Sequence, residues 1–355
     1  MGKRIIIIAP YPKGEAPSQR FRFEQYLDLL KQEGYEIEYH SFLSQKTWKA
    51  LYKEGALATK VFGIISSFFR RFILLFSLRK FDHIFIHREA SIIGPPIFEW
   101  IIAKVMRRKY IYDFDDAIWL PNYSDTNAKF HRLKAYWKVK KIMKWAGKIS
   151  AGNAYLKEYA LQFNSDVHIL PTTIDLENVH NIVTKQSELV NIGWTGTHTT
   201  MAYLDNLIPI IQRLEQKYSF TFTIISNQKP DFELDSLKFI QWTKESEIQD
   251  LATLNIGIMP LKYDVWAQGK CGFKALQYMA LQIPSVVSPI GVNKEIIQNG
   301  ENGYLCSSEE EWENTLSSLI ENKEQRIKIG QNGQQTIENH YSVKSQSDNF
   351  LNLFK

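Results

Sequence analysis

The chain has 355 residues, of which 44% are hydrophobic and 13% aromatic. This length and composition exclude a disordered segment, a coiled coil and a lone binding module, and they predict about two domains. Residues 1–170 contain 28 Lys and Arg against 16 Asp and Glu, whereas residues 171–355 contain 15 against 22, so we expect the first half to face an anionic partner.

Short apolar runs alternate with helical patterns, which predicts parallel sheets built from strand–helix–strand units. The first run, within residues 3–9, has five consecutive apolar residues before a proline and predicts a buried strand rather than a signal peptide. Further strands are predicted at 35–40, 83–87, 110–113, 149–150 and 167–170, and then at 189–194, 221–226, 238–241, 256–260, 285–288 and 303–306.

The strand pattern starts twice, with a proline-containing turn at 171–175 between the two runs. We therefore predict two doubly wound α/β domains, residues 1–172 and 173–341, with the last helical stretch, 342–355, packing back on the first. Ligands of such sheets bind at the carboxyl ends of the strands, where we expect the functional residues.

Two basic segments, 60–80 and 129–148, are predicted to form amphipathic helices. Their basic faces are assigned to Arg70, Arg71 and Arg79 in the first, and to Lys134, Lys138 and Lys141 in the second. Basic residues beside aromatic ones are typical of helices that lie on an anionic membrane surface, although a solvated charged face over an ordinary core is the alternative.

Three kinds of sequence signal are missing, and their absence limits the partners and compartments that we expect. Arg70 and Arg71 interrupt the apolar run 61–78, so no transmembrane helix is predicted. Nucleic acid is not an expected partner, since no binding motif accompanies the basic residues. The two cysteines, Cys271 and Cys306, exclude a disulfide framework and a four-thiolate zinc site. We expect a cytoplasmic protein, peripheral on the inner face of the cell membrane.

A glycine-containing loop at 269–272 runs into a predicted helix, so that free backbone N–H groups, Lys270 and Lys274 can meet a phosphate. Lys274 and Gln277 share one helix face, which suits a nucleotide with lysine on the diphosphate and glutamine on the ribose. Two solvated lysines at a helix start are the alternative.

The pattern Lys274-x-x-Gln277-Tyr278-Met279-Ala280, with Pro284 and Gly291 downstream, resembles the donor-site signature of GT-B glycosyltransferases, in particular retaining family four (glycosyl transferases group 1). Residues 192–196 are similar to the strand and loop that open that family's second domain. The resemblance covers most of the chain. It implies a GT-B fold, two Rossmann-like domains facing each other across a cleft, with the acceptor on the first domain and a nucleotide-sugar donor on the second.

The donor residues that the resemblance implies are Gly196, Thr197, His198, Lys270, Lys274, Gln277, Gly291, Val292 and Asn293. The family usually has two glutamates in the donor segment, and Gly269 and Gln277 occupy those places here. Its basic pair in the first loop of the second domain is replaced by residues 195–200. We therefore expect altered donor handling, in which loop N–H groups, Thr197, His198 and the two lysines hold the diphosphate.

In the first domain, Asp113, Asp115 and Asp116 end a strand and are too costly to bury together without partners. The resemblance gives Asp115 the place of a family histidine near the reacting sugar, with Asp116 the next candidate, so both join Lys274 as catalytic candidates. Helix capping is the alternative, and a metal site is disfavoured because the family transfers sugar without metal.

Acceptor-binding candidates follow the first and third strands. They are Ser18, Arg20, Arg22, His87 and Arg88. Pairing of the arginines with Glu24, and a purely structural histidine, are the alternatives.

The sequence thus predicts retaining transfer from a nucleotide-diphosphate sugar to a membrane-associated or lipid-linked glycan, in bacterial polysaccharide or lipopolysaccharide synthesis, with no metal and no cofactor besides the donor. Two alternatives remain. One is a non-catalytic GT-B protein that binds nucleotide or glycan in a membrane assembly, and the other is a nucleotide-sugar epimerase.

Overall fold

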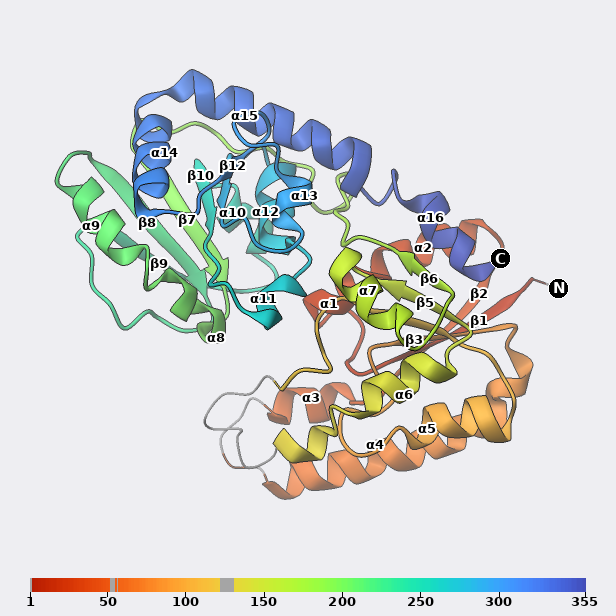
Figure 1. The fold of residues 1–355 in the computed structure, drawn as a ribbon. Coiled ribbons are helices and arrows are strands. Elements are labelled where there is room, and N and C mark those ends of the chain that lie inside the picture. Colours follow the sequence, from red (N-terminus) through yellow and green to blue (C-terminus); the bar gives the residue numbers. More distant parts are fainter. Residues whose placement is uncertain (1, 52–54, 56, 122–130) are drawn as a thin grey trace. The chain divides into compact units, whose positions relative to one another are not determined.

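A computed structural model describes residues 2–51, 55, 57–121 and 131–355, and these divide into two compact units (Figure 1). Unit 1 is Met1–Thr172 with Gln346–Lys355, and unit 2 is Thr173–Ser345. The division after residue 172 coincides with the predicted one, whereas the return to unit 1 begins at Gln346 instead of residue 342.

Unit 1 contains a six-stranded parallel sheet in the order β2-β1-β3-β4-β5-β6. Its strands are β1 (Arg4–Ala9), β2 (Glu36–Ser41), β3 (His83–His87), β4 (Ile111–Phe114), β5 (Lys148–Ala151) and β6 (Val167–Ile169). The apolar run Ile5–Ile8 is fully buried in β1, as expected of a strand covered on both faces.

The helices of unit 1 cover both faces of this sheet. The α-helices are α1 (Pro17–Arg20), α2 (Leu27–Gln32), α3 (Gln45–Leu51), α4 (Leu57–Ser77), α5 (Ile97–Trp100), α6 (Lys138–Trp145), α7 (Ala154–Leu161) and α16 (Ser347–Leu351). Short 3₁₀ or π segments are η1 (Glu24–Tyr26), η2 (Leu78–Lys80), η3 (Ile101–Val105), η5 (His131–Lys134) and η8 (Asn352–Phe354). Figure 1 shows α4, α5 and α6 on one side of the sheet, and α2 and α16 on the other.

Unit 2 contains a second parallel sheet, in the order β12-β11-β10-β7-β8-β9. Its strands are β7 (Val190–Gly196), β8 (Phe220–Ser226), β9 (Leu237–Gln241), β10 (Ile256–Met259), β11 (Ser285–Val287) and β12 (Tyr304–Leu305). Its helices are α8 (His198–Met201), α9 (Ile208–Glu215), α10 (Glu247–Leu251), α11 (Val265–Gln268), α12 (Phe273–Ala280), α13 (Asn293–Ile296), α14 (Glu309–Glu321) and α15 (Lys323–Thr336), with η6 (Ala202–Leu204) and η7 (Ile337–Tyr341). The predicted strands are confirmed in both units, with ends moved by one or two residues.

Close contact between α12 and the sheet depends on a glycine in β10. A Cβ at Gly257 would lie 2.4 Å from the Tyr278 ring, so only glycine lets this helix approach the strand. The Tyr278 hydroxyl accepts a hydrogen bond from Thr195 N at 3.1 Å and donates one to Ile258 O at 3.3 Å. These contacts fix α12 against the ends of β7 and β10.

The C-terminal segment completes unit 1. Phe350 stacks on Tyr26 with ring centroids 4.2 Å apart, and Asn349 donates to Ile169 O. Residues before it belong to unit 2, where Ser342 pairs with Ile174. The predicted packing of this segment on the first domain is therefore present, from Gln346 onward.

The predicted basic helix at 60–80 is present as α4 and η2, but Arg71 is not on its solvent face. The Arg71 guanidinium is buried and donates to the carbonyls of Ala90, His40 and Ala9 at 3.0, 3.2 and 3.2 Å. By length and composition alone, Leu57–Lys80 would be apolar enough to cross a bilayer, in contrast to the expectation from the sequence. The Arg71 contacts instead tie one face of this helix to the sheet.

The predicted single helix at 129–148 is wrong. Residues 129 and 130 lie outside the described part, and η5 is separated from α6 by Ala135, which has a left-handed backbone (φ 51°). Lys138 is also not on a basic surface. It is buried, with its ammonium 2.8 Å from both Ser91 O and Glu89 Oε2.

We predict that Arg71→Met lowers the stability of unit 1 by about 2–5 kcal/mol, because three hydrogen bonds from a buried guanidinium to carbonyls are lost, two of them fully buried. Urea unfolding followed by circular dichroism measures this effect. Arg79→Met, at an exposed position of η2, is the control and should stay within about 0.5 kcal/mol of wild type. Equal unfolding midpoints for the two variants would contradict the structural role of Arg71.

Candidate functional site

Strand order in unit 2 brings the predicted donor residues to one edge of the sheet. The order reverses between β7 and β10, which is the position where doubly wound sheets bind ligands beyond the carboxyl ends of their strands. The loops that follow β7, β10 and β11 all leave from this edge. Of the donor candidates, Thr197, Lys270, Gly291 and Val292 lie in these loops. Gly196 ends β7, His198 and Asn293 begin α8 and α13, and Lys274 and Gln277 lie on α12.

The loop after β7 exposes Thr197 and His198. The His198 backbone N–H donates to Asn227 Oδ1 at 2.9 Å, and its ring Nδ1 lies 3.2 Å from Asn227 Nδ2. Gly196 is required here, since a Cβ would lie 2.5 Å from the Trp194 ring. The loop is thus held in place while its polar side chains face solvent.

Two cations lie over aromatic rings near the start of α12, Lys274 on the helix and Lys270 in the loop before it. Lys274 Nζ lies 5.5 Å from the centroid of the Trp194 ring, and Lys270 Nζ lies 5.9 Å from that of Tyr203. Gly272, with a left-handed backbone (φ 66°), is the N-cap residue of this eight-residue helix. Two ammonium groups and a helix N-terminus form an environment that favours a phosphate.

The loop after β11 packs against the segment 268–272 that precedes α12. Gly291 has φ 56°, and a Cβ there would lie 2.9 Å from Gln268 O, so glycine is needed for this approach. A Cβ at Gly272 would lie 3.2 Å from Val292 Cγ1. Gly291 and Val292 therefore adjoin the loop that carries Lys270.

Two predicted donor residues lie in the interior instead. Gln277 is 1% exposed, and its amide donates to Glu247 Oε1 at 3.4 Å. Asn293 is equally buried and donates to Ser288 O at 3.0 Å. In this structure both amides bind protein groups, so they hold the loops and are not presented to a ribose.

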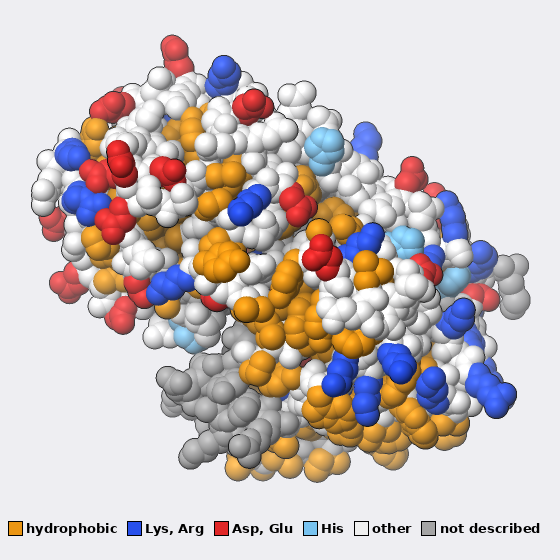
Figure 2. All heavy atoms as spheres, in the orientation of Figure 1, with side chains coloured by type: hydrophobic (Ala, Val, Ile, Leu, Met, Phe, Trp, Pro, Cys, Tyr) orange, Lys and Arg blue, Asp and Glu red, His pale blue; other side chains and the backbone are white. Residues whose placement is uncertain are grey.

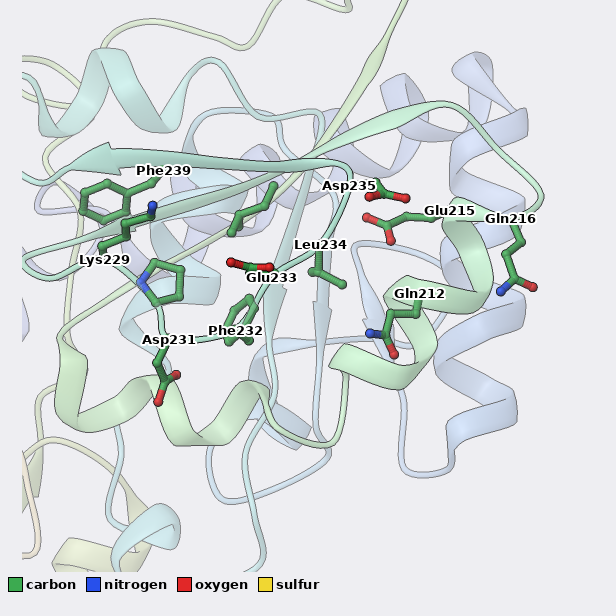
Figure 3. Close-up of a pocket in the computed structure, with 12 residues that line it drawn as sticks. Gln212, Glu215, Gln216, Lys229, Asp231, Phe232, Glu233, Leu234, Asp235 and Phe239 are labelled. Carbon is green, nitrogen blue, oxygen red and sulfur yellow. The ribbon is translucent and has the colours of Figure 1, made fainter.

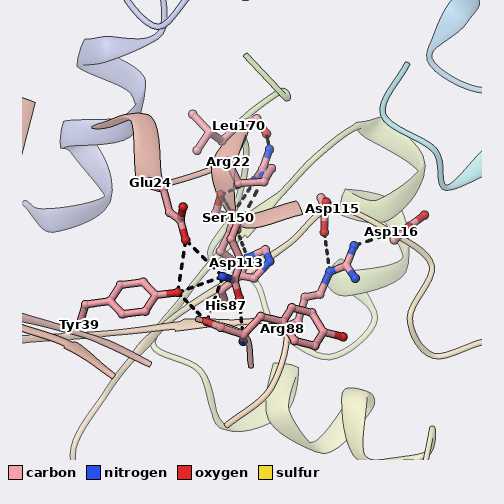
Figure 4. Close-up of polar contacts among 12 residues, drawn as sticks. Arg22, Glu24, Tyr39, His87, Arg88, Asp113, Asp115, Asp116, Ser150 and Leu170 are labelled. Carbon is pink, nitrogen blue, oxygen red and sulfur yellow. Dashed lines mark hydrogen bonds and ion pairs between the residues drawn. The ribbon is translucent and has the colours of Figure 1, made fainter. Parts of the chain in front are cut away.

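Unit 1 has a corresponding edge at the reversal between β1 and β3. Arg88 follows β3 with a left-handed backbone (φ 56°), and its Nε lies 2.7 Å from Asp115 Oδ1 and its Nη2 3.5 Å from Asp116 Oδ2 (Figure 4). Burial alone would lower the pKa of the Arg88 guanidinium, but the two carboxylates outweigh it and raise that pKa. The predicted catalytic aspartates therefore form an ion-paired group with a predicted acceptor residue.

A buried network of charged residues lies beneath this edge. It includes Arg22 and His87, for which the predicted acceptor-binding role is wrong in this structure. Arg22 is 1% exposed and binds Asp113 through Nη2 and Nε, Ser150 Oγ through Nη2 and Leu170 O through Nη1 (Figure 4). His87 is fully buried with Nδ1 2.7 Å from Asp113 Oδ2. Neither Arg22 nor His87 is presented to an acceptor in this structure.

The charge of Asp113 is stabilised by its neighbours. Burial would raise the pKa of this carboxyl, but Arg22 and the His87 hydrogen bond hold it well below its usual range. Ser150 Oγ also donates to Asp113 Oδ1 at 2.8 Å. Asp113 is therefore an internal anion, and the described residues include no group of three His, Cys, Asp or Glu placed to hold a metal ion.

The loop after β1 is organised by Gln19, which the sequence analysis did not single out, and by Glu24, which it named only as a partner for the arginines. Gln19 binds the Tyr11 backbone on both sides, accepting from its N–H at 3.0 Å and donating to its carbonyl at 3.1 Å. Glu24 accepts from Gly14 N at 2.8 Å. Of the predicted acceptor residues on α1, Ser18 and Arg20 remain partly exposed, and Arg20 packs over Phe21.

A separate groove of about 850 Å³ lies along α9 and the segment before β9 (Figure 3). Its charged lining is mostly acidic and comprises Glu215, Asp231, Glu233, Asp235 and Lys229. Four carboxylates against one lysine would repel a diphosphate, and the groove contains none of the predicted donor residues. We therefore assign the nucleotide to the edge near α12.

The two sheets with their helices define the GT-B fold. Over residues 190–322, within unit 2, the chain matches the family model described as "Glycosyl transferases group 1". Spore coat protein SA of Bacillus subtilis is 23% identical over 124 residues, which are 34% of this chain and 32% of that protein. The match thus spans about a third of this curated relative.

Solved structures share the fold over the whole chain. A glycosyltransferase from Rickettsia africae is 13% identical with a TM-score of 0.69, covering 100% of this chain and 98% of that one. Sucrose-phosphate synthase from Thermosynechococcus elongatus is 11% identical with a TM-score of 0.67, covering 99% and 98%. Anabaena HepE, solved in complex with UDP and glucose, is 14% identical with a TM-score of 0.62, covering 99% of each chain.

We predict that Arg22→Met destabilises the protein by about 3–5 kcal/mol, because Asp113 becomes a buried charge without its arginine. Adding Asp113→Asn to that variant should restore part of the loss. Thermal or urea unfolding measures both, with Arg20→Met as a control whose effect stays below about 1 kcal/mol.

The pH dependence gives a second check on this pair. The pKa of Asp113 is lower in the folded protein than in the unfolded chain, where it is about 4. Its contribution to the free energy of unfolding is therefore complete above about pH 4 and is lost as the pH falls further. Wild type should therefore lose more stability than the double variant on acidification. The same acid sensitivity in both would show that Asp113 is not the group responsible.

Proposed function

We propose that this chain is a glycosyltransferase that moves a sugar from a nucleoside-diphosphate sugar to a glycan or lipid-linked acceptor. One observation carries the proposal: Lys270, Lys274 and the N-terminus of α12 lie together at the β7/β10 reversal, within the part of the chain that matches glycosyl transferases group 1. This is a cationic site of the kind that holds a leaving diphosphate.

The proposed reaction breaks the bond between the donor sugar and the diphosphate and forms one to an acceptor hydroxyl. The diphosphate takes up the acceptor proton, and the configuration at the sugar is retained, as the family resemblance implies. Protein catalysis is then mostly positioning and stabilisation of the charge on the leaving group. We assign that stabilisation to Lys270 and Lys274, with no metal ion.

The acceptor is assigned to unit 1, where Arg88 holds Asp115 and Asp116 at the strand ends. Because both carboxylates are ion-paired, we assign them to orienting acceptor hydroxyls. Ser18 and Arg20 extend this surface beside the loop after β1. The described cysteines are both free, which agrees with the cytoplasmic compartment that we propose.

We predict that UDP raises the melting temperature of the protein, since a ligand bound only by the folded state stabilises it. UDP is the first nucleotide to test because HepE binds it in a structure of the same fold. A thermal-shift series with UDP, GDP, CMP and dTDP measures the preference. No shift with any of the four would contradict a preformed nucleotide site.

We predict that Lys274→Ala slows sugar release from the matching nucleotide sugar, with UDP-glucose as the first probe, by at least about tenfold. The fold should remain intact, since Lys274 is partly exposed. Lys262→Ala, which removes an exposed lysine of the same unit, is the matched control and should leave the rate unchanged.

Other outcomes of the same assay separate the alternatives. Nucleotide binding without sugar release would favour a non-catalytic protein, an alternative motivated by Gly269 and by the buried Gln277. Conversion of the donor to its epimer without acceptor would favour an epimerase. An unchanged rate in Lys274→Ala would remove this lysine from the mechanism.

A further inference from the structure

Helix α4 presents its apolar face to solvent. Along its length the outward side chains are large and hydrophobic, and Phe62 and Phe76 are 74% and 89% exposed. The remaining members of this face are Val61, Ile65, Phe69, Phe72 and Ile73. No charged residue interrupts it, since the charged positions within α4, at Lys60, Arg70 and Arg71, fall on other sides of the helix.

Three of the four buried residues of α4, Gly63, Ser67 and Arg71, are small or polar, and the fourth is Leu74. An ordinary surface helix buries its apolar face instead. Gly63 packs on Thr47 of α3 so closely that a Cβ would lie 2.5 Å from it. Ser67 donates to Gly63 O at 2.8 Å, and Arg71 binds three carbonyls of the sheet and its loops. The contact with Thr47 and the three bonds of Arg71 join α4 to other elements and fix which side of the helix faces outward, so the apolar face is left uncovered by the fold.

The exposed apolar surface continues onto neighbouring elements. Helices α4, α5 and α6 pack side by side, and Figure 2 shows a broad hydrophobic area over this side of unit 1. Trp100 and Val105 add to it from α5 and η3, and Leu133 and Trp137 add to it from η5 and the start of α6. We name this whole area the α4 surface.

The rim of the α4 surface is cationic. Figure 2 shows a row of Lys and Arg beside the hydrophobic area, and the exposed cations on and after η3 and on α6 are Lys104, Arg107, Lys109, Lys140, Lys141 and Lys144. Glu99 is the single acidic residue within α4, η2, α5, η3 and α6. It is buried and accepts a hydrogen bond from Ala90 N. No carboxylate on these elements offsets the exposed positive charge.

We infer that the α4 surface docks on an anionic lipid bilayer, with α4 parallel to the membrane plane. Aromatic and aliphatic side chains enter the headgroup and acyl boundary, Trp100 and Trp137 lie at the interface, and the lysines contact phosphate headgroups. A second copy of the chain fits this surface less well, because a two-fold contact would bring one cationic rim against another.

The docking surface stands independently of the proposed transfer. Its consequence for the substrate, that the acceptor is lipid-linked and presented at the membrane, rests on the proposed function. The two are separable because vesicle binding is measured without donor or acceptor.

The test is co-sedimentation of the full chain with phosphatidylcholine vesicles, with and without phosphatidylglycerol. We expect binding that requires the anionic lipid and weakens with salt. The double variant Phe69→Ser/Phe76→Ser should lower the partition coefficient at least about tenfold. The double variant Lys140→Glu/Lys141→Glu should remove the preference for anionic vesicles.

Leu161→Ser is the matched control, since Leu161 is an exposed apolar residue of unit 1 on α7, away from the α4 surface. It should bind like wild type, and melting curves should show every variant folded. Equal binding to neutral and anionic vesicles, or undiminished binding by the phenylalanine variant, would overturn the proposal. So would a wild-type dimer that the phenylalanine variant converts to monomers while vesicle binding is unchanged.

Discussion

Both units depend on one constraint: all strands of each sheet run in the same direction, and the first strand in the chain lies in the interior of the sheet. Each sheet begins with a strand that has neighbours on both sides, β1 in unit 1 and β7 in unit 2. The chain then adds strands first on one side and later on the other. Loops from distant parts of the sequence consequently leave from one edge beside the first strand. That edge gathers Lys270, Lys274 and Gly291 in unit 2, and Arg88 and Asp115 in unit 1.

The sequence is a good guide to what depends on local pattern. Apolar runs flanked by turn residues predicted the strands of both sheets, because a strand buried on two faces has a distinctive composition. The loops that carry the site follow from strand order, so most candidates lie at the expected edges. The prediction of a single helix at 129–148 was wrong because the left-handed backbone at Ala135 leaves no signal in residue type or spacing.

The sequence is a poor guide to which charged residues are internal. Arg22, Arg71 and Lys138 belong to segments where basic residues suggested a partner, yet all three are buried and bind groups of unit 1. Their partners are carbonyls, carboxylates and, for Arg22, the Ser150 hydroxyl, all from other elements, so the pairings depend on tertiary contacts. The same holds for Gln277, whose partner Glu247 lies thirty residues earlier. Charge composition therefore overstated the cationic surface of the two basic segments.

Unit 2 is inserted into unit 1, since the chain leaves unit 1 at Thr172 and re-enters it at Gln346. The last helical residues supply core aromatics, with Phe350 stacked on Tyr26 and Phe354 beside Phe85. During synthesis from the N-terminus, all of unit 2 emerges from the ribosome before those aromatics do. Unit 2 is thus able to complete its fold first, whereas unit 1 must wait with part of its core open until the final ten residues arrive.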